Sequence, residues 1–252
     1  MTKKNTYRIG QIVPSSNITM ETEIPALFRA REKTLPERFT FHSARMRMKK
    51  VTKEELAAMD AASDNCALEL SDARVDVMGY ACLVAIMAMG NGYHCVSQER
   101  LHKKTIENEF PTPVVTSAGA LIEGLNVLGA KNIALVMPYM KPLAQMVVKY
   151  IEHEGFVVKD WVALEIPDNL EVAAQNPQNL LKIYKRLNLT GVDTLVLSAC
   201  VQMPSLGAVA AVEKEAGIPV TTAAICTTYK MLKELQLDTS IPEAGALLSG
   251  RY

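Results

Sequence analysis

Residues 75–82 read VDVMGYAC, and residues 192–200 repeat the pattern as VDTLVLSAC. Each stretch opens on Val-Asp, runs through apolar residues and closes on Ala-Cys. Continuous apolar runs of this length are typical of strands that are buried on both faces of a parallel sheet. The two stretches therefore predict equivalent strands in two copies of one unit, ending at Cys82 and Cys200.

Two further pairs of stretches match in the same order along the chain. Residues 8–14 (RIGQIVP) correspond to residues 132–138 (NIALVMP), and residues 113–118 (PVVTSA) correspond to residues 219–224 (PVTTAA). The offset between partners shrinks toward the C-terminus. Three matches in one order with a shrinking offset indicate a duplicated α/β unit whose second copy has lost residues.

Strand and helix signals alternate over the whole chain, which favours parallel sheets with helices on both faces. The predicted strands span residues 7–14, 38–48, 75–82, 113–116, 132–138, 157–165, 193–200 and 219–222. The predicted helices span residues 53–70, the apolar segment after Cys82, and residues 117–128, 142–154, 180–187, 204–216 and 230–237. We expect an α/β fold of two similar Rossmann-like domains with parallel sheets, related by a pseudo-two-fold, with the active site in the cleft between them.

The duplication also predicts how the chain is divided. We expect the first α/β domain to comprise residues 1–116 together with residues 223–252, so that the C-terminal helix completes the first copy. The second α/β domain is expected to comprise residues 117–222.

The composition excludes several classes of protein. Lysine plus arginine total 27 and aspartate plus glutamate total 27, and this zero net charge counts against nucleic acid as a partner. The apolar stretch at residues 77–98 is interrupted by glycine, asparagine and histidine, so we expect no membrane span. The N-terminal residues lack the apolar stretch of a signal peptide, which predicts a cytoplasmic protein.

Cofactors and metals are not expected either. The five cysteines are odd in number and form no CxxC pair, which argues against a disulfide framework, and the cluster of His94, Cys95 and His102 lacks the spacing of zinc ligands. No GxGxxG or P-loop pattern follows a predicted strand, so nucleotide cofactors are not expected.

The two repeated cysteines are the candidate chemistry. Ligands of open parallel sheets bind beyond the carboxyl ends of the strands, where Cys82 and Cys200 lie. Each cysteine precedes a predicted helix, whose positive end favours thiolate over thiol. A two-fold arrangement of the copies predicts two thiols on opposite sides of one small ligand. Cys66, Cys95 and Cys226 have no such partner and are interpreted as packing residues.

Three stretches carry a resemblance to a known family: PSSNITME at residues 14–21, GYACLV at residues 79–84, and SACVQMPS at residues 198–205. Together they resemble the maleate cis-trans isomerases of the aspartate/glutamate racemase superfamily, over essentially the whole chain. The resemblance implies two similar α/β domains that enclose the substrate between a pair of cysteines, no cofactor, and a homodimer. It also makes nicotinate degradation, one source of maleate, a pathway to consider.

The resemblance implies maleate, a small dicarboxylate, as the substrate. Cys82 would add as a thiolate to C2 of maleate, rotation about C2–C3 would follow, and elimination would give fumarate. Cys200 would lie on the opposite face, as an acid/base or as a positioning group.

The resemblance further implies that Asn17, Tyr139 and Asn169, with backbone N–H groups at Cys82 and Val84, bind the substrate carboxylates. Asn17 and Tyr139 each follow the first strand of a copy, so both are expected to point into the cleft. A plainer interpretation stays open for each: a helix N-cap for Asn17, a half-buried ring for Tyr139, and a turn for Asn169.

Two other functions remain alternatives at this point. A cofactor-independent racemase of an amino acid or hydantoin would use Cys82 and Cys200 as opposed proton carriers, but the racemases usually carry Cys-Asn-Thr and Gly-Cys-Thr where this chain has Cys-Leu-Val and Ala-Cys-Val. A non-catalytic binder of dicarboxylates is the second alternative. A decarboxylase of arylmalonates is a weaker interpretation, because those enzymes generally keep only the second cysteine and this chain also has Cys82.

Overall fold

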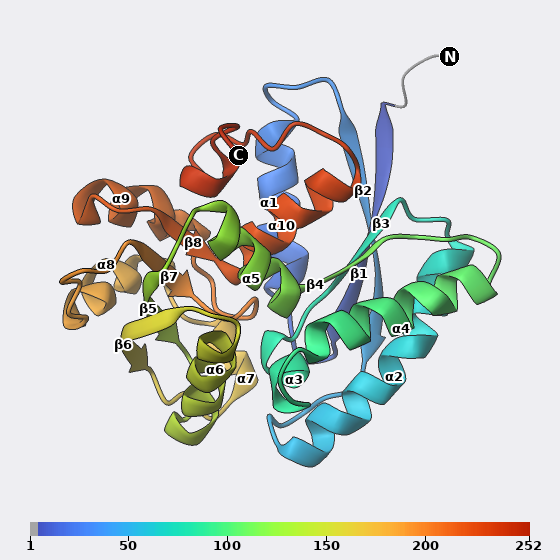
Figure 1. The fold of residues 1–252 in the computed structure, drawn as a ribbon. Coiled ribbons are helices and arrows are strands. Elements are labelled where there is room, and N and C mark those ends of the chain that lie inside the picture. Colours follow the sequence, from blue (N-terminus) through green and yellow to red (C-terminus); the bar gives the residue numbers. More distant parts are fainter. Residues whose placement is uncertain (1–4) are drawn as a thin grey trace.

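The computed structural model describes residues 5–252, in which eight strands form two four-stranded parallel sheets. The first sheet contains β1 (Thr6–Pro14), β2 (Arg38–Met46), β3 (Val77–Tyr80) and β4 (Val114–Thr116). The second contains β5 (Asn132–Met137), β6 (Val157–Ala163), β7 (Thr194–Ser198) and β8 (Val220–Thr222). The two sheets lie on opposite sides of the molecule (Figure 1).

The two sheets have the same topology. Their strand orders are β2-β1-β3-β4 and β6-β5-β7-β8, so each strand of the second sheet sits four numbers after its equivalent in the first. The three pairs of matching sequence stretches fall on β1 and β5, β3 and β7, and β4 and β8. The prediction of two similar parallel α/β units is therefore confirmed.

Helices cover both sheets. In the first half they are α1 (Met20–Arg31), α2 (Lys53–Asp72), α3 (Leu83–Ala88), α4 (Tyr93–Glu107) and α5 (Ser117–Val127). In the second half they are α6 (Lys141–His153), α7 (Asn169–Ala173), α8 (Leu180–Ile183), α9 (Leu206–Ala216) and α10 (Ala223–Glu234), with short 3-10 helices η1 (Pro177–Asn179), η2 (Tyr184–Arg186) and η3 (Ala246–Leu248). No helix in the described part of the chain is long and apolar enough to span a bilayer.

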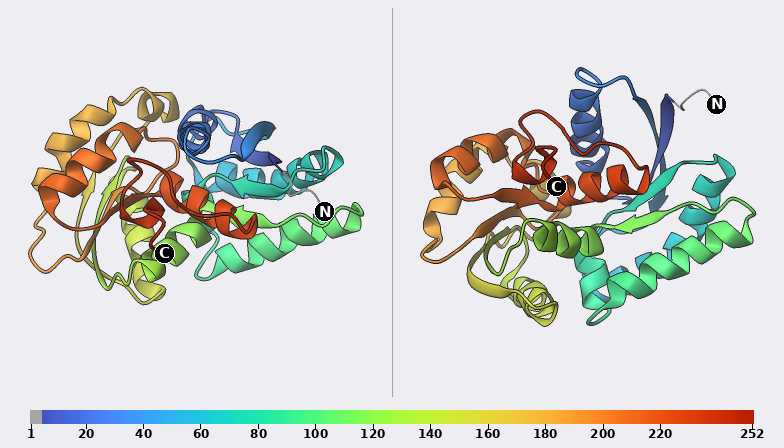
Figure 2. Two further views of the ribbon diagram at one scale, coloured as in Figure 1. Left: turned by 90° about the horizontal axis from the view of Figure 1, so that it is seen from above. Right: turned by 45° about the horizontal axis from the view of Figure 1, so that its top comes forward.

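The packing of the helices follows the strand order. On the first sheet α2 and α4 pack against each other, and α1 packs against α10. On the second sheet α6 packs on β6, and α9 packs on β8. The views in Figure 2 show α5 (green) and α10 (red) lying between the two sheets.

The central pair α5 and α10 begins in the same way in both copies. Thr116 and Thr222 each end a strand and cap the helix that follows, because their hydroxyls accept from the N–H groups of Gly119 and Ile225. From there α10 returns to the first sheet, where it contacts α1, β3 and β4. The predicted domain boundaries are compatible with this path, although residues 1–4 of the predicted first domain lie outside the described residues.

Three helical regions differ from the prediction, and one is the short helix α7, whose residues Asn169–Ala173 were not expected to be helical. The α1 helix was not expected, because Pro25 lies inside it and the buried Glu23 and Arg31 break its apolar pattern. The single apolar helix predicted after Cys82 is two helices, α3 and α4, separated at Gly90 and Gly92. Both glycines have a positive φ, 117° and 70°, a conformation that ends a helix and that glycine adopts without steric cost.

Candidate active site

All six predicted site residues line one small cavity between the two sheets. Most of them lie just beyond the ends of strands, and Asn169 lies at the start of α7. The six residues are Asn17, Cys82, Val84, Tyr139, Asn169 and Cys200. The cavity has a volume of about 30 Å³, which has room for about one water molecule. A four-carbon dicarboxylate needs more space than this cavity alone provides.

A larger pocket of about 370 Å³ adjoins this cavity. It shares Val51, Tyr139, Asn169 and Cys200 with the cavity, and apolar side chains of α6, including Leu143 and Met146, form much of its wall. Cys200 lines both spaces, whereas Cys82 lines only the smaller cavity.

Cys82 stands two residues beyond β3 and directly before α3. Its φ of 97° is unusual for a residue with a side chain, and residues held in this way cluster at functional sites. Its carbonyl accepts the N–H of Ala85 at 3.1 Å, which starts the helix.

The ionisation of Cys82 differs from the prediction. Burial raises the pKa of its thiol to about 12, with further increases from Cys200 and Asp60, while the N–H of Ala85 lowers it. The start of α3 therefore acts in the predicted direction, but desolvation outweighs it. The expectation of a resting thiolate was wrong, and the protonated thiol is the favoured form.

Cys200 stands two residues beyond β7, in the position equivalent to Cys82. A turn separates it from α9, so the predicted helix terminus at this cysteine is absent from its immediate surroundings. Burial raises the pKa of the Cys200 thiol, whereas the Tyr139 hydroxyl and the N–H groups of Gln202 and Met203 lower it. More donors therefore face Cys200 than face Cys82.

The position of Asn17 is compatible with both roles that the sequence left open, a helix N-cap and a ligand of a substrate carboxylate. The side chain is 3% exposed, and its Oδ1 accepts the N–H groups of Thr19 and Met20, both at 3.0 Å, at the start of α1. This cap uses the oxygen and leaves the amide nitrogen without a partner among the described residues. Asn17 lines the cavity, so its free N–H groups are available to a carboxylate there.

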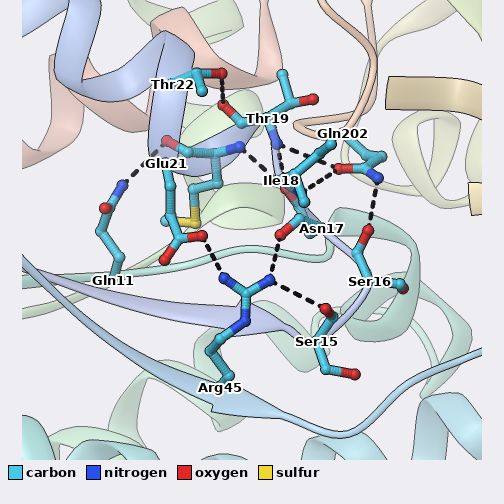
Figure 3. Close-up of polar contacts among 11 residues, drawn as sticks. Gln11, Ser15, Ser16, Asn17, Ile18, Thr19, Glu21, Thr22, Arg45 and Gln202 are labelled. Atoms are coloured by element: carbon cyan, nitrogen blue, oxygen red, sulfur yellow. Dashed lines mark hydrogen bonds and ion pairs between the residues drawn. The ribbon is translucent and has the colours of Figure 1, made fainter. Parts of the chain in front are cut away.

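Arg45 on β2 holds the loop that carries Asn17, a role that no sequence motif indicated. Its guanidinium donates to the carbonyls of Ser15 at 3.0 Å and Asn17 at 2.7 Å, and it pairs with Glu21 (Figure 3). This arginine therefore binds the backbone of the loop and does not line the cavity, and no lysine or arginine among residues 5–252 lines it.

Tyr139 and Val84 supply donors from opposite sheets. The Tyr139 hydroxyl donates to the carbonyl of Ala199 at 3.1 Å, and burial and the neighbouring Cys200 hold its pKa well above its usual range, so it stays protonated. Val84 lies in the first turn of α3, where backbone N–H groups have no partner within the helix.

Asn169 and Gln202 join the two halves. The Asn169 amide donates to the Ser16 hydroxyl at 2.8 Å, so at least one of its N–H groups is used by the protein. Gln202 lies in the motif around Cys200 but was assigned no role. Its side chain is 3% exposed and accepts from the loop of Asn17 (Figure 3). It also donates to the carbonyl of Asn169. A bridge of this kind depends on the distance between two loops, which no local pattern encodes.

A second contact between the halves lies beside this bridge. The carboxylate of Glu23 on α1 accepts the N–H groups of Ser205 and Leu206, both at 2.6 Å, and so caps α9. Burial raises the pKa of Glu23, while these hydrogen bonds lower it.

A buried polar network supports the strand that leads to Cys82. Asp60 on α2 accepts the hydroxyls of Tyr80 at 3.1 Å and Tyr93 at 2.7 Å, and its carboxylate pairs with Arg100 at 3.1 Å. These contacts fix the end of β3 against α2 and α4, two residues before the cysteine.

The remaining cysteines lie away from the cavity. Cys66 and Cys226 are buried and Cys95 is exposed, and all five thiols are free. Within residues 5–252 no group of three or more His, Cys, Asp or Glu side chains is placed to bind a metal ion.

Comparison with known proteins agrees with the geometry. The family model described as arylmalonate decarboxylase matches residues 9–248. A maleate isomerase from Pseudomonas putida is 67% identical over 246 residues, which make up 98% of this chain and 98% of that protein.

Two solved structures extend the comparison. The maleate isomerase of Pseudomonas putida S16, as a cysteine-to-alanine variant with maleate, has a TM-score of 0.97 and 64% identity and covers 98% of this chain and 99% of its own. The maleate cis-trans isomerase of Nocardia farcinica, as a cysteine-to-serine variant with a covalently bound succinylcysteine intermediate, has a TM-score of 0.94 and 46% identity and covers 98% of this chain and 100% of its own. This chain therefore belongs to the maleate isomerases, within the family that the arylmalonate decarboxylase model describes.

Proposed function

We propose that this protein isomerises maleate to fumarate without a cofactor, through a covalent bond to Cys82. The observation that carries the proposal is one cavity, between the carboxyl ends of two equivalent sheets, that holds two thiols and several neutral hydrogen-bond donors. The maleate isomerases at 47% to 67% identity, and the succinylcysteine intermediate of the Nocardia farcinica enzyme, support it.

The reaction begins when the Cys82 thiol loses its proton to solvent, which leaves the thiolate, and this proton returns after the thiolate is expelled at the end of the cycle. The thiolate sulfur adds to C2 of maleate, and the electron pair of the double bond moves through C3 into the far carboxylate as an enediolate. The C2–C3 bond is then single and rotates by about half a turn. Return of the electron pair re-forms the double bond as fumarate and expels the thiolate, so no proton or electron is consumed.

The surroundings of Cys82 fit a strong nucleophile. A thiol with a pKa of about 12 is rarely ionised at neutral pH, but the thiolate that forms is poorly stabilised and therefore reactive. Cys82 lines the cavity, where its sulfur is available to a ligand.

The substrate carboxylates would be held by fixed dipoles. Asn17, Val84, Tyr139 and Asn169 all line the cavity, and the Tyr139 hydroxyl would have to exchange its bond to the Ala199 carbonyl for one to the substrate. Donors that are already in position stabilise the enediolate with little reorganisation, and the lack of a cation lets the dianionic product leave. We assign Cys200 to the opposite face, as an acid/base or a positioning group for this intermediate.

The test is to incubate the protein with maleate in heavy water and to observe the fumarate by NMR. Addition, rotation and elimination leave both vinyl hydrogens in place, so the product is expected without deuterium. Quantitative deuterium at the vinyl position would overturn the thioether route and favour a proton-transfer mechanism between the two thiols. No turnover of maleate at all would overturn the proposed activity.

We also propose the division of the chain that the repeats predict: residues 1–116 with residues 223–252, and residues 117–222. The strand composition of the two sheets and the return of α10 to α1 and β3 support it.

We also propose a cellular location, an oligomeric state and a source of maleate for this protein. Free thiols at all five cysteines fit a reducing compartment, which supports a cytoplasmic location. Exposed apolar side chains at Met89 and Val96, near the junction of α3 and α4, are compatible with a homodimer. Nicotinate degradation is proposed as the source of maleate, on the family resemblance alone.

A further inference from the structure

Gln202 uses its whole hydrogen-bonding capacity across the cleft. Its Oε1 accepts the N–H of Ile18 at 3.0 Å and approaches the N–H of Thr19 at 3.4 Å. Its Nε2 donates to the carbonyls of Ser16 at 2.8 Å and Asn169 at 2.7 Å. An amide has two donors and two acceptor sites, and here all four have partners.

The partners of Gln202 lie on the two segments that carry the proposed carboxylate ligands. Ser16 and Ile18 flank Asn17 in the loop after β1, while Asn169 begins α7 in the other half of the molecule. A link between the Asn169 amide and the Ser16 hydroxyl at 2.8 Å runs beside it. One side chain, two residues after Cys200, thus sets the separation of both segments.

We infer that Gln202 is a positioning residue, which holds the amides of Asn17 and Asn169 at the separation that a four-carbon dicarboxylate requires. The inference rests on the proposed function, because it assumes that these amides bind the two carboxylates. Gln202 acts through the loops and takes no part in bond making.

The bridge has a second consequence. The segments that Gln202 joins bound the cavity that both thiols line. Loss of its bonds is expected to loosen these segments, to raise KM for maleate and to expose the thiols.

The first variant is Gln202→Glu, which keeps the shape and the acceptor but removes both N–H donors. An ionised carboxylate would face the carbonyl oxygens of Ser16 and Asn169 and repel them, whereas a protonated carboxyl would donate to one of them. Burial raises the pKa of a carboxyl above its usual value of about 4.3. We expect kcat/KM about tenfold below the parent at pH 8, mainly through KM, with the deficit shrinking as the pH falls toward 6.

Other groups that titrate near Gln202 are common to the parent and the variant. Cys82, Cys200 and Tyr139 share the cavity, Glu23 caps the adjacent α9, and Arg45 binds the loop of Asn17. The ratio of variant to parent kcat/KM at each pH therefore reports the new carboxyl alone.

A second variant, Gln202→Asn, keeps the amide but is one methylene shorter, so it reaches only one segment. We expect a similar loss of kcat/KM without the pH-dependent recovery. Gln178→Glu is the matched control, because the Gln178 amide donates to the carbonyl of Gly207 at 3.1 Å within the second half only. It is expected to behave as the parent at every pH.

A measurement that needs no turnover accompanies the kinetics. The rate at which iodoacetamide, a neutral reagent, alkylates Cys82 and Cys200 is followed by mass spectrometry of the folded proteins. Both Gln202 variants are expected to react about tenfold faster than the parent and the control. Equal alkylation rates, or kcat/KM ratios that do not vary with pH in Gln202→Glu, would overturn the inference. A parent without maleate turnover would remove the proposed function, while the alkylation rates would still decide whether Gln202 holds the two segments together.

Discussion

The two halves of the molecule share one strand order but surround their equivalent cysteines differently. At Cys82 the strand passes directly into a helix through a strained residue with a φ of 97°, and one backbone N–H faces the thiol. At Cys200 a turn replaces the helix start, and a tyrosine hydroxyl and two N–H groups face the thiol.

This difference shows that the fold sets where the two thiols lie, whereas the neighbouring residues set how readily each thiol ionises. The duplication places two thiols at matching strand ends, but the residues that follow each strand decide how well an anion on sulfur is stabilised. Poor stabilisation of the anion at Cys82 supports its proposed role as the nucleophile, whereas the donors at Cys200 stabilise its anion and so support the proposed exchange of a proton there. The two halves are thus alike in fold, and we propose that their cysteines differ in role.

The largest effect is expected when each cysteine is replaced by serine, which tests whether the two cysteines have different roles. Cys82→Ser replaces the soft thiolate by a hydroxyl that ionises far less readily, and we expect kcat to fall about 10⁴-fold. Cys200→Ser keeps an O–H on the opposite face, and we expect a fall of about 10²-fold, the scale of a lost acid/base. Steady-state conversion of maleate to fumarate measures both.

Mass spectrometry distinguishes the two roles further. In Cys200→Ser incubated with maleate, a covalent adduct with the mass of one maleate is expected on the peptide that contains Cys82. Equal losses in the two serine variants, or an adduct on Cys200 in the Cys82→Ser protein, would show that the halves act symmetrically.

A smaller effect is expected at the two amides. Asn17→Asp keeps the oxygen that caps α1 but turns the free amide nitrogen into a charged oxygen, which repels a substrate carboxylate. We expect KM for maleate to rise about 10²-fold, with the free energy of unfolding changed by less than about 0.5 kcal/mol, because aspartate caps as well as asparagine.

The equivalent change in the other half is expected to cost less. The amide of Asn169 already has Ser16 as a partner, and an aspartate there would accept from the same hydroxyl, so Asn169→Asp is expected to raise KM about tenfold. The pair of KM values, with thermal unfolding as the control for folding, checks the ranking. A larger effect at Asn169 would mean that the second half supplies the main carboxylate contact.

The smallest effect concerns the stability of the protein at alkaline pH. Burial raises the pKa of Cys226 in α10 to about 12, whereas the unfolded chain loses this proton near pH 8.5. The folded state thus binds more protons above pH 8.5, so its stability is full below that pH and declines toward pH 12. We expect this thiol alone to remove about 1 kcal/mol of unfolding free energy between pH 8 and 9.5.

Cys226→Ala isolates that contribution. The variant is expected to be less stable than the parent at pH 7, because it leaves a small void, but to lose less stability as the pH rises. Denaturant unfolding at several pH values measures the two slopes, and parallel slopes would contradict the assignment. Cys95→Ala, at an exposed thiol, is the control.

Much of the fold follows from local patterns. The three matching pairs of stretches locate six of the strands and their equivalence, because a strand buried on both faces has to be apolar throughout. The α1 helix was not predicted because Pro25, Glu23 and Arg31 interrupt its apolar pattern. Their presence is explained only by tertiary contacts, such as the cap that Glu23 provides for α9. The glycines at positions 90 and 92 did signal the break between α3 and α4, but the apolar run around them obscured it.

The residues that line the site could be predicted from the sequence, but the protonation of Cys82 could not. Position after a strand end brings Asn17, Cys82, Tyr139 and Cys200 to one cavity, and their roles stay predictions. The protonation of Cys82 was misjudged because desolvation depends on what covers the thiol, which a sequence does not state. Gln202 was missed because its partners, three of them in residues 16–19 and the fourth at Asn169, lie far from it along the chain and meet it only after both halves have folded.

The cap that Glu23 provides has a consequence for cooperativity. The first N–H groups of α9 belong to one half of the molecule, and the carboxylate that satisfies them belongs to the other. An excised half would leave the α9 donors or the Glu23 carboxylate to water, and would lose the capping bonds that they make to each other. We therefore expect the two α/β units to unfold together, each stabilised by the contact with the other.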